Sequence, residues 1–290
     1  MPVLKFGRKV FLIMFAALAS LITQACSQAG LFVANAPTYF GDYKVQTDIL
    51  YNPQTGQKLD VYRPDTVKQD SPVIVFLYGG RWSEGSKNDY RFVGSFFAQN
   101  GYVTVIPDYR KYPAVKFPAF VEDAAQAVQW VGKHIKPENG IVLSGHSAGA
   151  HMGALLAADE RYLQAVDVDP RNITGFVGLA GPYSFTPEAE DLKDMFGRPE
   201  NYPQMQVTTF IDGAEPPMLL LHGAEDETVK AANYEKLETK IKEQGGAVET
   251  HLVDGLGHVD IVSALTWIYR SQRPVDTLIL EFLAGKSQKE

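Results

Sequence analysis

A short run of small residues at 145–149 places one serine where it could act as a nucleophile. Gly145-His146-Ser147-Ala148-Gly149 lies between an apolar run expected to be a strand and an apolar segment expected to be a helix. In this strand–turn–helix context the turn is so tight that the serine needs small neighbours, and its hydroxyl then projects above the end of the strand. The N-terminus of the following helix favours negative charge at the same place. The pattern therefore predicts that Ser147 is a nucleophile.

Two further residues lie where they could activate this serine. A serine nucleophile needs a general base, and the base needs a group that orients it. Asp226 follows an apolar run expected to be a strand, and His258 follows the last predicted strand in a glycine-rich loop. The chain order serine, acid, histidine suits a fold in which each residue follows a different parallel strand. We predict that Ser147, His258 and Asp226 form a catalytic triad. Glu225 and Glu227 are the alternative acids.

Glycines after the first buried strand could bring backbone amides close to a developing negative charge. Gly79 and Gly80 follow the apolar run at 73–78. Because they carry no side chain, N–H groups beside them can approach an oxyanion, and losing one such donor typically costs about 2.7–4 kcal/mol of transition-state stabilisation. We predict that the oxyanion hole consists of the amides of Gly80 or Arg81 and of Ala148.

Other polar residues near these motifs have structural interpretations. We expect the Arg81 side chain to be solvated, unless it binds an anionic group of a substrate. Trp82 is expected to lie in the core. Asp108 and Arg110 are expected to brace a loop through an ion pair with each other. Three further histidines are expected to be structural: His151, His222 and His251.

The chemistry of a serine, a histidine and an aspartate requires no cofactor or metal, and none is expected. Residues 167–172 faintly resemble a calcium loop, but the sixth-position glycine and the twelfth-position glutamate are missing. The chain also lacks the zinc-binding, phosphate-binding and dinucleotide-binding sequence motifs.

The apolar pattern predicts the elements that must position these residues. Continuous apolar runs predict strands buried on both faces, and apolar residues at helical spacing predict helices between them. This alternation predicts an α/β fold, with a mostly parallel central sheet and helices on both faces. Residues 182–216 break the alternation and are expected to form a small cap over the sheet edge. The predicted strands are 45–51, 58–63, 73–78, 102–107, 140–143, 173–179, 217–221 and 248–253, and the predicted helices are 92–99, 120–135, 147–159, 231–244 and 261–285, the last broken at Pro274.

Composition excludes several classes of protein. A chain of 290 residues, 45% of them apolar, suits one large domain or two small ones. The net charge of −7 argues against nucleic-acid binding, which needs a basic surface. A single cysteine excludes disulfide bonds within the chain and a thiolate metal cluster.

The first 26 residues are expected to be an export signal and not part of the fold. Lys5, Arg8 and Lys9 precede a 13-residue apolar run at 10–22, whereas a membrane-spanning helix needs about 20 apolar residues. Cys26 follows this run and resembles the lipidated cysteine of bacterial lipoprotein signals. Lipoproteins carry more than one acyl chain, which is what stable membrane anchoring needs.

Two other fates of this segment remain open. Cleavage after residue 29 would release a soluble secreted protein, and an uncleaved segment would act as an anchor. We expect an exported protein, either a periplasmic lipoprotein anchored in the membrane through Cys26 or a secreted one. A linker is expected at 27–38 and a single domain at 39–286.

Taken together, the motifs resemble the α/β-hydrolase superfamily, and within it the bacterial esterase and lipase group of hormone-sensitive-lipase-like and feruloyl-esterase-like carboxylesterases. The resemblance covers residues 40–285. It implies an α/β-hydrolase fold and hydrolysis of carboxylic esters by an acyl-enzyme mechanism. The family usually has His-Gly-Gly where this chain has Tyr-Gly-Gly. The residues that carry the resemblance are YGGRW (78–82), PDYR (107–110), GHSAGAH (145–151), HGAEDETV (222–229) and GLGH (255–258).

The short N-terminal region and the modest insertion favour a small-molecule, short-acyl ester as the substrate. GHSAGAH together with FLYGGRW is also similar to kynurenine formamidases and to plant prenylcysteine methylesterases. The first alternative is therefore an arylformamidase or another amide-type hydrolase that uses the same site. The second is a non-catalytic binding protein that reuses the fold.

Overall fold

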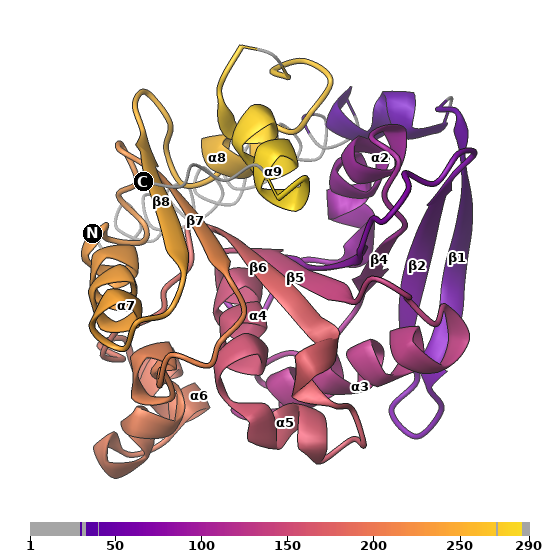
Figure 1. Ribbon diagram of the computed structural model, residues 1–290. Coiled ribbons are helices and arrows are strands. Elements are labelled where there is room, and N and C mark those ends of the chain that lie inside the picture. The colour runs from indigo at the N-terminus through magenta and orange to yellow at the C-terminus, as the bar shows by residue number, and fades with distance from the viewer. Residues whose placement is uncertain (1–29, 31–32, 40, 271, 286–290) are drawn as a thin grey trace, which may run out of the picture.

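A twisted eight-stranded sheet forms the centre of the computed structural model, which describes residues 30, 33–39, 41–270 and 272–285 (Figure 1). The strand order is β1-β2-β4-β3-β5-β6-β7-β8. β1, β2 and β4 pair antiparallel, and all pairs from β4 to β8 are parallel. The strands are β1 (Tyr43–Asn52), β2 (Gln57–Pro64), β3 (Val73–Leu77), β4 (Thr104–Pro107), β5 (Ile141–His146), β6 (Ile173–Leu179), β7 (Met218–Gly223) and β8 (Val248–Val253).

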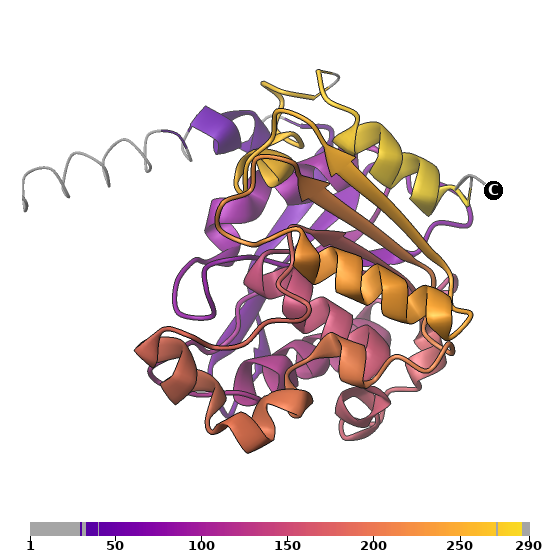
Figure 2. The same ribbon diagram turned by 90° about the vertical axis from the view of Figure 1, so that its left-hand side faces the viewer.

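Helices cover both faces of this sheet, as the alternating pattern predicts. α2, α8 and α9 lie on one side, and α3, α4 and α7 lie on the other (Figures 1 and 2). Every residue of β3, β5 and β7 is buried, which explains their continuous apolar sequences. The α-helices are α2 (Arg91–Gln99), α3 (Ala119–His134), α4 (Ala148–Ala158), α5 (Glu160–Gln164), α6 (Glu190–Phe196), α7 (Ala232–Glu243), α8 (Asp260–Ser263) and α9 (Val275–Leu283). The 3-10 helices are η1 (Ala36–Tyr39), η2 (Lys87–Tyr90), η3 (Pro170–Asn172), η4 (Pro199–Gln204) and η5 (Val207–Thr209).

Helix α4 lies directly against the sheet because its residues are small. Its residues 148–156 are all buried. A Cβ atom added to Gly149 would lie 2.0 Å from the carbonyl oxygen of Leu77, and one added to Gly153 would lie 3.0 Å from the ring of Phe176. Glycine at these positions therefore allows the helix after β5 to approach β3 and β6 closely, which sets the position of its N-terminus.

The insertion at 182–216 contains α6, η4 and η5 and packs beside the α3–α5 side of the molecule. The amide of Phe117 donates to the carbonyl of Met195, and the ring of His151 contacts the carbonyl of Met205. The insertion lines a cavity of about 930 Å³ together with residues of α3 and α5. The cap therefore covers helices, and it contacts the loop after β3 through the ion pair between Arg81 and Asp191 and through the ring of Trp82, which packs on Phe185 and Phe196.

The segment before β1 is held against the domain. The Asn35 side chain is buried, donates to the carbonyls of Asn88 and Asp89, and accepts from the amide of Phe92. The described part of the segment expected as a linker thus makes specific contacts with η2 and α2. The predicted signal and Cys26 lie outside the described residues. Within the described part of the chain, no helix has the length and hydropathy needed to cross a membrane.

Candidate active site

Ser147 occupies the sharp turn between β5 and α4 with strained backbone angles. Its φ of 52° and ψ of −120° lie in a region that residues with a side chain rarely adopt. The turn requires small neighbours, since a Cβ atom on Gly145 would lie 2.5 Å from the carbonyl carbon of Gly149. The amide of Ser147 donates to the carbonyl of Leu179 at 2.9 Å, which ties the turn to the end of β6. The hydroxyl is thereby held at the carboxyl edge of the sheet.

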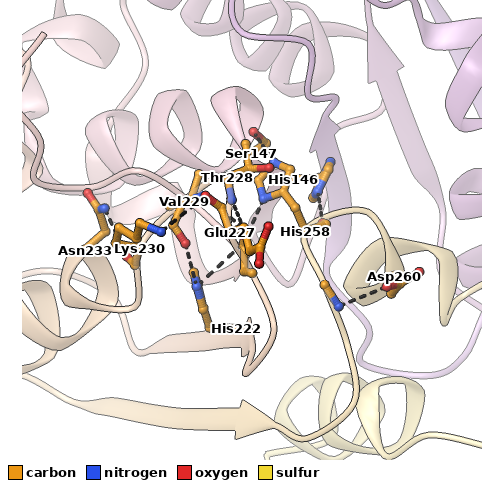
Figure 3. A network of polar contacts seen from close by, with 12 residues as sticks. His146, Ser147, His222, Glu227, Thr228, Val229, Lys230, Asn233, His258 and Asp260 are labelled. Carbon is orange, nitrogen blue, oxygen red and sulfur yellow. Dashed lines mark hydrogen bonds and ion pairs between the residues drawn. The ribbon is translucent and has the colours of Figure 1, made fainter. Parts of the chain in front are cut away.

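Three side chains that are far apart in the sequence form a hydrogen-bonded chain at this edge. His258 Nε2 lies 2.8 Å from Ser147 Oγ, and His258 Nδ1 lies 2.7 Å from Asp226 Oδ2. The Asp226 carboxylate is fully buried, and the imidazole of His258 is 13% exposed. Figure 3 shows Ser147 and His258 meeting above the end of the sheet, with Thr228 beside them. The structure therefore brings together the serine, base and acid that the sequence singled out.

The other carboxylate oxygen of Asp226 is fixed by the backbone of its own loop. Oδ1 accepts the amide N–H groups of Thr228 and Val229, both at 2.8 Å. Only Oδ2 is therefore directed at the histidine. The loops that carry Asp226 and His258 are also bound to each other, because the amide of Glu225 donates to the carbonyl of Leu256 at 3.0 Å.

The loop after β3 forms a tight turn beside the serine. Gly80, Arg81 and Trp82 all have positive φ, at 132°, 52° and 58°. A Cβ atom on Gly79 would lie 3.1 Å from Cβ of Ser147, so this loop contacts the serine directly. Among the described residues, the amides of Gly80, Arg81 and Ala148 donate to no carbonyl or side-chain acceptor. They are available to a ligand, as an oxyanion hole would require.

The tyrosine that replaces the usual histidine of this loop lies outside the site. Tyr78 is fully buried, its ring stacks on Tyr109 at 4.5 Å, and its hydroxyl donates to Asp108 Oδ1 at 3.0 Å. Its side chain therefore supports the loop from within the core. Gly80 and Arg81 still line the cavity.

A buried ion pair anchors the far end of the same loop. Lys87 is 1% exposed, and its Nζ lies 2.8 Å from Asp60 Oδ1 and 3.0 Å from Asp48 Oδ1. Its amide donates to Asp108 Oδ1 at 3.0 Å. The loop at 80–90 is thus fastened to β1, β2 and the end of β4.

Ser147 and His258 lie in a cavity of about 1070 Å³. One wall is the loop after β3, with the acidic side chains of Glu84 and Asp89. The rest of the lining includes two segments, one before β1 and one after His258, that sequence reasoning did not associate with the site. No local sequence pattern marks either segment. They are held together by the bond from Trp267 Nε1 to the carbonyl of Val33 at 3.1 Å. The apolar and aromatic residues of these two segments are Val33, Ala34, Val259, Val262, Ile268 and Tyr269.

The BD-FAE family model matches residues 59–241, which include the loop after β3, Ser147 and Asp226. The chain belongs to the BD-FAE family.

Curated relatives of this BD-FAE protein include named esterases. It is 26% identical over 257 residues to the isoprenylcysteine alpha-carbonyl methylesterase of Arabidopsis thaliana, covering 79% of this chain and 60% of that protein. It is 29% identical over 238 residues to esterase LipC of Mycobacterium tuberculosis, covering 72% of this chain and 58% of that protein. The chain thus spans about three fifths of the length of these two relatives.

The solved structures show that the fold is that of α/β-hydrolases. Inhibited esterase B from Lactobacillus rhamnosis superposes with a TM-score of 0.73 at 21% identity, covering 94% of this chain and 97% of that one. The predicted fold class, with its mostly parallel sheet and surrounding helices, is confirmed.

Three further histidines of the BD-FAE protein make polar contacts with groups other than Ser147 and His258. His151 Nε2 lies 2.7 Å from the carbonyl of Met205, and His251 Nε2 lies 2.6 Å from Glu249 Oε1. His222 Nε2 lies 3.0 Å from the carbonyl of Val229. Burial lowers the pKa of His151 to about 4 and also lowers the pKa of His222. His151 and His222 are therefore neutral at neutral pH.

The expected ion pair between Asp108 and Arg110 is wrong. Arg110 instead binds Asp123 of α3, with Nη2 lying 2.7 Å from Oδ1. Asp108 accepts from Tyr78 and from the amide of Lys87. The reason is that the chain after β4 runs along α3, which presents Asp123 on the side of Arg110.

The two residues after Gly80 lie in different surroundings. Trp82 is buried, as expected, and its ring stacks on that of Phe185 at 5.6 Å. Arg81 pairs with Asp191 of α6 at 2.9 Å, and both side chains are about half exposed. The described residues contain no group of three or more histidine, cysteine, aspartate or glutamate side chains that could hold a metal ion.

Proposed function

We propose that this protein is a carboxylesterase that hydrolyses small or short-acyl esters through an acyl-enzyme on Ser147. The observation that carries the proposal is the chain of hydrogen bonds from Asp226 through His258 to Ser147 at the base of an open cavity. The names of the Arabidopsis and Mycobacterium relatives support ester hydrolysis.

The directions of these hydrogen bonds support a specific first proton transfer. A carboxylate can only accept, so His258 Nδ1–H donates to Asp226, and the unprotonated Nε2 faces the hydroxyl of Ser147. When Oγ attacks the ester carbonyl, its proton passes to Nε2, and the negative charge of Asp226 stabilises the imidazolium that forms. The imidazolium then protonates the departing alcohol as its C–O bond breaks. A water molecule activated by Nε2 releases the acid from Ser147 by the same steps.

The backbone donors around Ser147 suit the charge that develops on the carbonyl oxygen. Ala148 is the first residue of α4, and its amide lies at the positive end of the helix dipole. The amides of Gly80 and Arg81 belong to the loop that contacts the serine from the other side. We propose that the tetrahedral oxyanion binds between these two groups of donors.

The proposed size of the substrate rests on the position of the insertion. None of the residues 182–216, all of which the structure describes, lines the cavity that holds Ser147. The insertion therefore does not line the space around Ser147 in which an acyl chain would lie. An open cavity with an apolar wall suits a compact ester.

Turnover of a p-nitrophenyl ester series from C2 to C16 tests the proposal, with the purified full chain and its Ser147→Ala variant. We expect the highest kcat/KM at C2 to C6, and a loss of at least a thousandfold in kcat in Ser147→Ala with an unchanged melting curve. Turnover retained by a folded Ser147→Ala protein would refute the role of Ser147. Better turnover of C12 to C16 esters would refute the proposed substrate size.

Two parallel assays address the alternatives. Hydrolysis of N-formylkynurenine at a higher kcat/KM than any of the esters would assign the site to an amide-type hydrolase, to which the GHSAGAH motif is also similar. Failure of a fluorophosphonate probe to label wild-type Ser147 would favour a binding protein, because that reagent reacts only with an activated serine.

A further inference from the structure

The residue before the serine, His146, is buried and makes contacts through both ring nitrogens. Its exposed fraction is 4%. Nε2 lies 2.8 Å from the main-chain carbonyl oxygen of His258, and Nδ1 lies 3.0 Å from the hydroxyl oxygen of Tyr90. Figure 3 shows His146 beside Ser147 and His258. His146 therefore contacts the loop of the base from the same turn that carries the serine.

The direction of these hydrogen bonds follows from the chemistry of the groups. A carbonyl oxygen only accepts, so His146 Nε2 carries the proton and donates to His258. Nδ1 is then an acceptor, and the hydroxyl of Tyr90 donates to it. Tyr90 is the last residue of η2, at the end of the loop after β3. The donors run in one direction, from Tyr90 through His146 to the carbonyl of His258.

This direction requires that His146 is neutral. Burial, followed by the neighbouring imidazole of His258, lowers the pKa of His146 to about 3, although the charge of Asp226 acts in the opposite sense. The ring centroids of the two histidines are 4.9 Å apart. At neutral pH His146 therefore presents one donor and one acceptor.

This network connects the two loops whose relative position matters most for the reaction, because Tyr90 lies at the end of the loop at 80–90 and His258 lies in the other loop. Gly79 immediately precedes the amides of Gly80 and Arg81. A Cβ atom on Gly79 would lie 2.8 Å from His146 Nδ1, so the loop also packs on the imidazole ring. The network ends at the main chain of His258 itself. Shifts of about 1 Å between such groups can reduce a rate a hundredfold.

We propose that Tyr90 and His146 are positioning residues that hold the loop carrying the Gly80 and Arg81 amides in register with the loop carrying His258. This inference rests on the proposed function, since it assigns the two residues to the geometry of the same reaction. Neither side chain transfers a proton to or from the ester. Their effect is on kcat, because the relative position of the two loops matters most when the oxyanion and the imidazolium exist together.

Tyr90→Phe removes the central hydroxyl and keeps the ring, which packs on Phe76, Tyr78 and Phe92. We expect kcat for p-nitrophenyl butyrate to fall about tenfold to a hundredfold, with KM changed less than twofold. Rates are divided by the number of sites that a fluorophosphonate titrates, so that unfolded protein does not contribute. Tyr102→Phe is the matched control. It removes another buried tyrosine hydroxyl, bonded to Lys68 outside the cavity, and is expected to leave kcat unchanged.

A second pair of variants tests the direction of the hydrogen bonds. Glutamine can donate through Nε2 and accept through Oε1, whereas leucine can do neither. His146→Gln is therefore expected to retain at least ten times the kcat of His146→Leu, which a role in packing alone would not predict. If Tyr90→Phe does not fold, this comparison alone tests the positioning role.

The outcomes separate the two proposals. An inactive wild-type protein, or an active Ser147→Ala protein, overturns the proposed function. If the wild type is active and Ser147→Ala is not, a Tyr90→Phe protein within twofold of the wild-type kcat overturns the positioning role. Equal rates for His146→Gln and His146→Leu overturn it as well.

Discussion

Replacing Asp226 with asparagine changes one atom of the hydrogen-bonded chain and should reverse the tautomer of the histidine. Oδ1 of Asp226 accepts two amides at 2.8 Å, so the asparagine oxygen is expected to take this position. Its NH₂ group then faces His258 Nδ1, where the carboxylate oxygen accepted at 2.7 Å. Because the amide donates, Nδ1 must become the acceptor and the ring proton must move to Nε2.

This tautomer cannot take the proton of Ser147, since Nε2 already carries one. A serine hydrolase with the wrong tautomer loses about 10⁴ in kcat, which corresponds to about 5 kcal/mol of transition-state stabilisation. The fold should be retained, because the bonds to the amides of Thr228 and Val229 are kept. We therefore expect a change in the free energy of unfolding of about 1 kcal/mol or less, which is the range for one altered hydrogen bond.

The assay is p-nitrophenyl butyrate hydrolysis at pH 7.5, with urea unfolding of the same samples. Glu225→Gln and Glu227→Gln are the controls, because both glutamates are exposed neighbours of Asp226 and each variant also removes one negative charge. Each is expected to retain the wild-type kcat within twofold. A folded Asp226→Asn protein with more than a tenth of the wild-type kcat would refute the tautomer argument. A large loss in one glutamate variant would identify that residue as the acid instead.

Two further predictions concern stability. Burial holds the pKa of His146 at about 3 and that of His151 at about 4, whereas both are about 6.5 in the unfolded chain. The unfolded state therefore binds more protons than the folded state below pH 6.5, so the free energy of unfolding decreases as the pH falls. Together the two residues should lower the free energy of unfolding by about 4 kcal/mol between pH 7.5 and pH 5. Urea titrations should show about half of this loss disappearing in His151→Asn, and identical pH profiles would contradict the argument. Lys87→Met leaves the fully buried carboxylate of Asp60 without its cation and should lower the free energy of unfolding by about 3–5 kcal/mol. Lys116→Ala breaks an exposed ion pair and should lower the free energy of unfolding by at most about 1 kcal/mol. Equal losses in the two variants would refute the argument that burial makes the loss of the Lys87 cation more costly.

The end of β5 shows that an apolar pattern alone does not predict where a strand ends. The apolar run predicts that β5 ends at Leu143, but the strand continues to His146. Ser144, Gly145 and His146 have little preference for strands. They are extended because they pair with residues 177–179 of β6. The position of the serine at the edge of the sheet therefore depends on a neighbouring strand as well as on its own motif.

The positions of the insertion and of the segments that line the cavity are likewise not predicted by the sequence pattern. Residues 182–216 lack a period that would place them, and they pack on the α3–α5 side through contacts such as that between His151 and Met205. The wall of the cavity is instead built from segments near the two ends of the domain. They are joined by the bond between Trp267 and Val33, which lie 234 residues apart.

The sequence by itself determined the elements of the fold and the three residues that meet at the carboxyl edge of the sheet. It does so because burial imposes a period on each strand and helix, and because the tight turn at Ser147 demands small residues nearby. Only the tertiary structure decided that Arg110 pairs with Asp123, that Lys87 is buried and that Tyr90 meets His146. These pairings join segments distant in the chain, and their geometry depends on how finished elements pack, which no local pattern of residues records.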